Sequence, residues 1–84
     1  MWLKELFEKD NVDFPEWLPN EYLKDEWKDA VYFKGENIHK WELTNPFGMN
    51  IITLTNNVYL FQGYDEDNQL IFEQGFTPEE EYTS

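Results

Sequence analysis

The sequence predicts an α+β fold in which two short N-terminal helices pack on a four- or five-stranded antiparallel β-meander. Apolar residues recur at helical spacing in the first 29 residues, whereas β-branched and aromatic residues dominate short runs from Ala30 onward. The links between these runs are only a few residues long, which favours sequential antiparallel neighbours. A chain of 84 residues buries only about 60% of its unfolded surface and has room for one modest core. We therefore expect a single domain, 1–84.

The first helix is predicted between Met1 and Asp10. Its apolar residues fall on one helical face: Trp2, Leu3, Leu6 and Phe7. A second helix is predicted over residues 19–28, where Tyr22, Leu23 and Trp27 share a face. Ahead of it, the segment 13–16 has a cap residue, a proline and a glutamate in the order of a capping box, which indicates a helix start.

Five strands are predicted after the helices, near 30–34, 38–44, 49–55, 58–63 and 69–75. The breaks between them contain residues that tolerate turn or left-handed geometry: Gly35–Asn37, Asn45–Gly48, Asn56–Asn57 and Asp65–Asn68. Residues 77–84 are predicted to be a frayed, polar tail.

Sixteen aromatic residues are more than a domain of this size can bury completely. The periodicity selects these core candidates: Phe7, Trp17, Trp27, Val31, Trp41, Ile52, Leu54, Leu60, Phe61 and Phe72. The aromatic residues expected nearer the surface are Tyr22, Tyr32, Tyr59, Tyr64, Phe47 and Phe76. Surface tyrosines beside carboxylates are typical of protein interfaces, although their hydroxyl groups can equally reach solvent at a sheet edge.

The chain carries 18 acidic residues, six lysines and no arginine, for a formal net charge of −12. This balance argues against direct nucleic-acid binding and against docking on an anionic membrane, because both need positive surface. The negative electrostatic field of such a chain instead attracts a basic protein surface. The charge is uneven, since residues 65–84 contain seven acids and no lysine, while residues 30–64 are neutral.

Three acids on the second predicted helix, Glu21, Asp25 and Asp29, are four residues apart. On an α-helix their carboxylates would lie about 6 Å apart, close to the spacing of phosphates along one nucleic-acid strand. The row therefore suggests imitation of a phosphate ladder, and its alternative interpretation is an ordinary solvated helix face. The residues predicted to bind a partner are Glu21, Asp25, Asp29, Tyr59, Tyr64, Asp65, Glu66, Asp67 and Glu73.

The residue inventory argues against an enzyme. There is no cysteine, His39 is the only histidine and Ser84 is the only serine, so nucleophilic catalysis lacks its usual groups. The segment starting at Asp65 begins like a calcium loop, but Leu70 and Phe76 stand where glycine and glutamate are required, so a polar hairpin tip is expected instead. No cofactor and no metal are predicted.

The leading hypothesis is therefore an inhibitor that occupies the basic surface of a nuclease, DNA-repair enzyme or defence enzyme, with carboxylates in place of phosphates. In composition the chain is similar to small acidic phage proteins that block restriction, CRISPR or repair enzymes. The alternatives are an immunity protein for a nuclease toxin and an accessory or scaffold subunit that docks through the neutral aromatic sheet. The N-terminus lacks the pattern of a signal peptide, so a cytoplasmic location is expected. Composition leaves the oligomeric state open.

Overall fold

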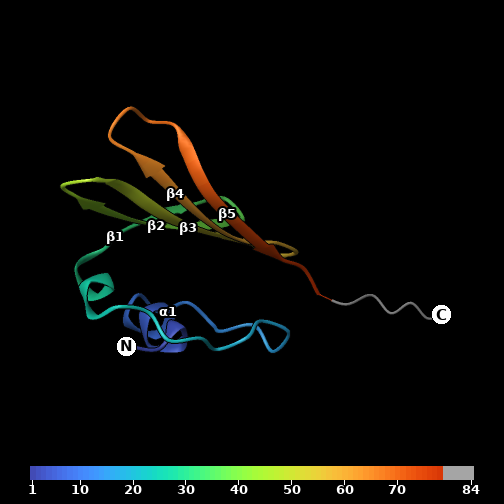
Figure 1. Ribbon diagram of the computed structural model, residues 1–84. Helices are drawn as coiled ribbons and strands as arrows, with labels where there is room; N and C mark the ends of the chain where they lie inside the picture. Colours follow the sequence, from blue (N-terminus) through green and yellow to red (C-terminus); the bar gives the residue numbers. More distant parts are fainter. Residues whose placement is uncertain (79–84) are drawn as a thin grey trace.

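The computed structural model describes residues 1–78 and shows a mostly β protein built on one antiparallel sheet (Figure 1). The elements in chain order are α1 (Leu3–Lys9), the 3-10 helix η1 (Asp25–Asp29), β1 (Val31–Gly35), β2 (Ile38–Asn45), β3 (Gly48–Thr55), β4 (Tyr59–Asp65) and β5 (Leu70–Phe76). The strands lie side by side in the order β1-β2-β3-β4-β5, and each pairs antiparallel with its neighbours. The sheet is open, with β1 and β5 at its two edges.

The predicted meander is confirmed, and every predicted strand boundary lies within two residues of the observed one. The turns follow the expected chemistry, because Asn37 and Asn68 adopt left-handed backbone geometry with φ of 64° and 63°. Gly48 is required at the β2–β3 turn, where φ is 147° and an added Cβ would lie 1.9 Å from the Tyr64 carbonyl oxygen. Residues 79–84 of the predicted tail lie outside the described residues.

The second predicted helix is confirmed only in part. Within the predicted 19–28 segment only the residues from Asp25 onward are helical, they form a 3-10 helix, and the capping-box pattern at 13–16 starts no helix. The reason is a long-range contact that sequence periodicity does not report. Residues around Trp2 and Tyr22 form an isolated antiparallel bridge, so the chain at this point is extended rather than helical.

This N-terminal pairing is held by backbone hydrogen bonds. The Leu3 N–H donates to the Glu21 carbonyl at 2.9 Å, and the α-amino group of Met1 donates to the Leu23 carbonyl at 2.9 Å. The Lys4 N–H, an otherwise unpaired donor in the first turn of α1, donates to the Asn20 side chain at 2.9 Å. Residues 1–24 therefore form one layer, with α1 clamped against the extended segment that precedes η1.

The N-terminal layer packs on one side of the sheet (Figure 1), which we call the covered face. The contact is centred on Trp41, whose ring stacks on Phe7 of α1 with centroids 4.5 Å apart and planes 2° apart. The Trp41 Nε1–H also donates to the Asp10 carboxylate at 2.8 Å, just after the end of α1. The Trp41 ring thus joins the sheet to α1, is fully buried, and has its one polar atom hydrogen-bonded.

The buried core lies between the two layers. Its apolar members are Leu3, Leu6, Phe7, Val12, Leu18, Leu23, Trp27, Ala30, Trp41, Leu43, Ile52, Leu54 and Tyr59. Five predicted core residues are confirmed as buried: Phe7, Trp27, Trp41, Ile52 and Leu54. Trp17, Leu60 and Phe61 are partly buried, whereas Val31 and Phe72 are 55% and 47% exposed, so the last two predictions are wrong.

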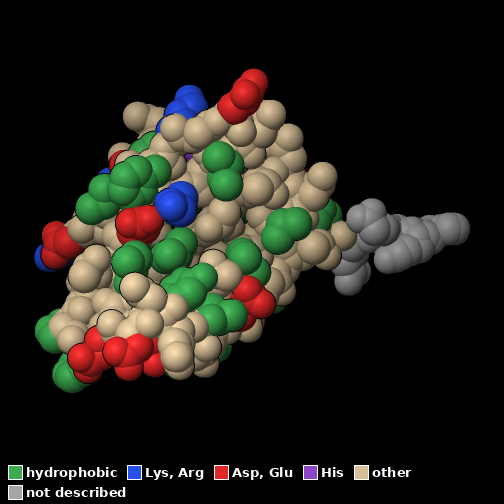
Figure 2. Space-filling view, turned by 90° about the horizontal axis from the view of Figure 1, so that it is seen from above, with side chains coloured by type: hydrophobic (Ala, Val, Ile, Leu, Met, Phe, Trp, Pro, Cys, Tyr) green, Lys and Arg blue, Asp and Glu red, His purple; other side chains and the backbone are tan. Residues whose placement is uncertain are grey.

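The other side of the sheet, which we call the open face, is not covered by any element within residues 1–78. The strand register places these side chains on it: Val31, Phe33, Ile38, Lys40, Glu42, Ile51, Thr53, Leu60, Gln62 and Glu73. Figure 2 shows this face, with hydrophobic side chains in several groups and acidic side chains between them and at the margin. Val31 is exposed because it alternates with Tyr32, which faces the core. Phe72 is exposed because it lies on the edge strand β5.

The helices give no candidate for a membrane span, since none within residues 1–78 combines the length and the apolar character that crossing a bilayer requires.

Candidate functional site

The three acids predicted to form a helical row do not share one helix face. Glu21 lies in the extended segment before η1, Asp25 begins η1 and Asp29 ends it. Glu21 is only partly exposed, and its Oε2 is buried without a hydrogen-bond partner among the described residues. The spacing that would imitate a phosphate ladder therefore does not occur, although Asp25 and Asp29 are both exposed.

Asp25 has a structural task. Its Oδ1 accepts a hydrogen bond from the α-amino group of Met1 at 3.0 Å and another from the Tyr22 hydroxyl at 3.1 Å. These bonds, with the positive charge of the amino group, hold the pKa of the Asp25 carboxyl below its usual value. The same contact raises the pKa of Tyr22, because Asp25 accepts its proton in a hydrogen bond and its charge disfavours the phenolate. Asp25 thus ties η1 to the chain start.

The second predicted group lies in the β4–β5 hairpin, at its tip. Asp65 Oδ1 accepts the backbone N–H groups of Asp67 and Gln69, each at 2.9 Å, which closes the turn. Asp65 is consequently half-buried and oriented toward the backbone, while Glu66 and Asp67 are exposed. The carboxylates of Glu66 and Asp67 are therefore free at the tip, while the Asp65 carboxylate stabilises the turn.

Glu73 and Tyr64 extend this acidic hairpin along the open face. The Glu73 carboxylate accepts a hydrogen bond from the Gln62 amide at 2.8 Å across the β4–β5 pair, and Glu73 is exposed. Tyr64 is partly exposed near a shift of register between β4 and β5. The β4–β5 hairpin thus carries five of the predicted residues near its tip and along β5: Tyr64, Asp65, Glu66, Asp67 and Glu73.

Tyr59 requires a correction, because its predicted surface position is wrong. Its side chain is fully buried on the covered face, and its hydroxyl finds no hydrogen-bond partner among residues 1–78. Burial, with a smaller contribution from the charge of Glu21, raises the pKa of Tyr59 strongly. Tyr59 is part of the core and does not reach a partner from there.

His39 packs against Tyr32 of the neighbouring strand. Its Nδ1 lies 2.6 Å from the Tyr32 hydroxyl, and its ring stacks on the Tyr32 ring with centroids 6.0 Å apart. Both rings are partly buried next to Trp41. Within residues 1–78, no three His, Cys, Asp or Glu side chains gather in a way that could hold a metal ion.

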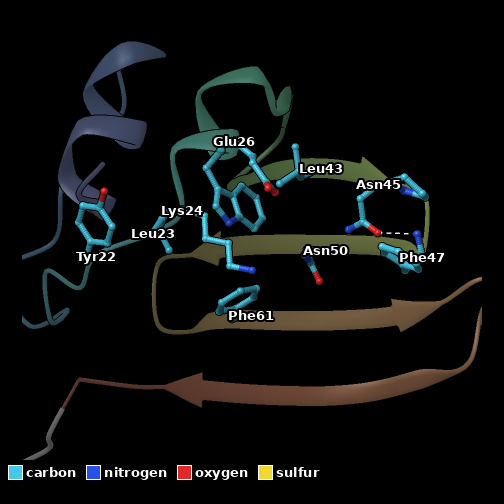
Figure 3. A pocket seen from close by; sticks show the side chains of 11 residues that line it. Tyr22, Leu23, Lys24, Glu26, Leu43, Asn45, Phe47, Asn50 and Phe61 are labelled. Atoms are coloured by element: carbon cyan, nitrogen blue, oxygen red, sulfur yellow. Dashed lines mark hydrogen bonds between the residues drawn. The ribbon is translucent and has the colours of Figure 1, made fainter.

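A hollow of about 590 Å³ lies between η1 and the far end of the β2–β3 hairpin (Figure 3). Figure 3 shows Lys24 and Glu26 at one side, Phe47 at the hairpin end, and Asn50 and Phe61 on the sheet. Phe47 is held there by the turn, since its N–H donates to the Asn45 side chain at 2.8 Å. The lining offers apolar rings and amide groups, with one lysine balancing one glutamate.

Sequence reasoning missed the exposed apolar part of the open face, above all Val31, Phe33 and Ile38. Their exposed fractions are 55%, 45% and 37%. Strand alternation carries the relevant signal, because successive side chains point to opposite faces of the sheet. Tyr32 pairs with the buried Trp41, so Val31 and Phe33 lie on the open face. Lys40 and Glu42 share this face as an ion pair at 3.0 Å, and Lys40 also lies over the Phe33 ring at 5.5 Å.

Comparison of the chain with protein-family models, with curated proteins and with solved structures finds no match in any of the three.

Proposed function

We propose that the chain is a non-enzymatic acidic binding protein that inhibits a nucleic-acid-binding enzyme by occupying its basic DNA- or RNA-binding surface. The enzyme classes that fit are nucleases, DNA-repair enzymes and defence enzymes, and an immunity protein for a nuclease toxin would use the same chemistry. The proposal rests on the excess of free carboxylates at the surface.

That excess is large for so small a protein. Eleven of the 15 acidic residues within 1–78 are exposed. Within the same residues only three ion pairs occur, and two of them use the lysines Lys9 and Lys40. A surface of this kind carries a negative potential that steers a basic partner toward it and repels nucleic acid.

The geometry supports imitation of phosphate charge rather than of phosphate spacing. Ten of these 11 exposed carboxylates project from two regions, residues 1–29 and the β4–β5 hairpin, instead of from one helical row. The hairpin is the better candidate for the contact, because residues 65–84 contain no lysine to compensate their acids. In residues 1–29, four lysines are interleaved with the acids.

The test is inhibition of a panel of purified nucleases, repair enzymes and restriction enzymes at about 50 and 200 mM salt, where screening differs strongly. We expect at least one enzyme to be inhibited, with an inhibition constant that rises with salt. The double variant Glu66→Gln/Asp67→Asn should weaken inhibition. The matched control Glu8→Gln/Glu16→Gln removes the same charge from exposed positions in the N-terminal layer and should weaken it less.

A second candidate is an accessory subunit that docks through the open face. The observation in its favour is the exposed apolar surface of Val31, Phe33 and Ile38, on a sheet region whose net charge is zero. Binding by this route would be nearly independent of salt. It would survive the Glu66→Gln/Asp67→Asn change and would be lost on Phe33→Ser.

A further inference from the structure

The two edges of the sheet differ in how well they are protected against pairing with another strand. An edge strand presents a row of unpaired backbone N–H and C=O groups, and proteins usually blunt such edges with lysine, proline or short strands. The β1 edge is five residues long and carries Lys34. The β5 edge is seven residues long, contains neither lysine nor proline, and pairs with β4 alone within residues 1–78.

The β5 edge also offers side-chain contacts on both of its sides. Phe72 and Glu73 are successive residues in the regularly paired part of β5 and therefore point to opposite sides of the sheet, and both are exposed. A register shift lies at Gly63/Tyr64, opposite the start of β5, while Phe72 to Phe76 pair regularly with β4. The regular stretch is long enough to template an added strand, whose main-chain hydrogen bonds give affinity and whose alternate side chains give specificity.

Charge decides which kind of strand this edge accepts. Glu73 lies in the middle of β5, Glu66 and Asp67 are exposed just before it, and residues 65–84 contain no lysine. A second copy of the chain is disfavoured, because two β5 strands related by a two-fold axis would bring Glu73 close to its own equivalent, and like charges on paired strands are destabilising. Each copy would also carry the full charge of −12.

We propose that the free edge of β5 binds an extended, lysine- or arginine-bearing segment of the partner protein by strand addition. This inference rests on the proposed function and specifies how the basic partner is held: main-chain hydrogen bonds along residues 72–76, with basic side chains directed toward Glu73 and the hairpin tip.

The experiment uses the full chain labelled with ¹⁵N and three capped heptapeptide probes. The first alternates lysine and valine, the second alternates glutamate and valine, and the third has the sequence of the first with every backbone nitrogen methylated. Amide chemical shifts and amide hydrogen exchange are followed by NMR during each titration. The lysine peptide should shift the amides of residues 70–76 and slow hydrogen exchange along β5, while β1 stays unchanged.

The methylated peptide keeps the charge but cannot donate main-chain hydrogen bonds, so its affinity should be at least ~10-fold lower. The glutamate peptide should not bind. Among protein variants, Glu73→Gln should weaken the lysine peptide several-fold, whereas Glu42→Gln, also on the open face but on β2, should leave its affinity unchanged.

Two results would overturn the proposal. If the methylated and unmethylated lysine peptides bound equally well, charge alone would account for binding, and strand addition would be wrong while inhibition of a basic enzyme still stood. If the shifts mapped to β1 or to the centre of the open face, the β5 edge would not be the site. Failure of the proposed function looks different, because then no enzyme of the panel would be inhibited, whichever peptide binds.

Discussion

The covered and open faces of the sheet carry large apolar side chains that differ in their exposure to solvent. Trp41 and Ile52 on the covered face are fully buried, whereas Phe33 and Val31 on the open face are 45% and 55% exposed. The difference arises because, within residues 1–78, one short N-terminal layer covers one face of the sheet and no element covers the other (Figure 1). The comparison separates two surfaces, since the covered face carries the core and the open face leaves apolar side chains exposed.

The largest expected effect is the loss of Trp41. Trp41→Ala removes the ring that stacks on Phe7 and the donor to Asp10, so the free energy of unfolding should fall by about 3–5 kcal/mol. The open-face control Phe33→Ala should cost less than ~1 kcal/mol. Urea denaturation of both variants measures the difference. Equal losses would mean that the open face also contributes to the core, and the division between the faces would be wrong.

The next effect concerns Tyr59 in alkaline solution. Its folded-state pKa is raised above the ordinary value of about 10, so the unfolded chain releases this proton at a lower pH than the folded chain does. The stability that this difference contributes is fully present below pH 10 and is lost as the pH rises further. The midpoint of urea unfolding should therefore drop above pH 10.

The matched variant is Tyr59→Phe, which keeps the ring and removes a buried hydroxyl that has no hydrogen-bond partner among residues 1–78. At neutral pH its stability should equal that of the unmodified chain or exceed it by up to ~1 kcal/mol. Above pH 10 the alkaline loss should be smaller in this variant. An identical alkaline loss in both proteins would assign the effect to other tyrosines.

The smallest effect is expected at Asp25, which is exposed. Its pKa is lowered in the folded state by the Met1 amino group and the Tyr22 hydroxyl, so its contribution is present above the ordinary aspartate pKa and is lost as the pH falls through the lower folded-state value. Asp25→Asn should be slightly less stable than the unmodified chain at pH 7, and thermal melts should show this gap closing in acid. A gap that persisted unchanged at low pH would contradict the assignment.

The sheet could be predicted from the sequence because its signals are local. Strand alternation and turn residues such as Asn37 and Asn68 are read within a few positions, and antiparallel neighbours follow from short links. The second helix was predicted only in part, because the pairing of Trp2 with Tyr22 spans twenty residues and no local pattern reports it. The predicted row of helical carboxylates failed for the same reason.

Tyr59 shows a different kind of miss. It lies two residues before Phe61, a predicted core residue, so alternation alone places both side chains on the same face. Tyr59 was nevertheless predicted at the surface because of its residue type, since tyrosine near acidic residues is typical of protein interfaces. Val31 is the converse case, since a β-branched residue at a strand start fits either face until its register with β2 is known.

The central claim is that free carboxylates of the β4–β5 hairpin, rather than the apolar open face, hold the partner. The most direct measurement is the dissociation constant for an enzyme that the chain inhibits, determined by calorimetry at several salt concentrations for the unmodified chain, Glu66→Gln/Asp67→Asn and Phe33→Ser. We predict that affinity falls steeply with salt, that the hairpin variant reduces both the affinity and the salt dependence, and that Phe33→Ser changes little. An affinity that is independent of salt and lost in Phe33→Ser would contradict the claim.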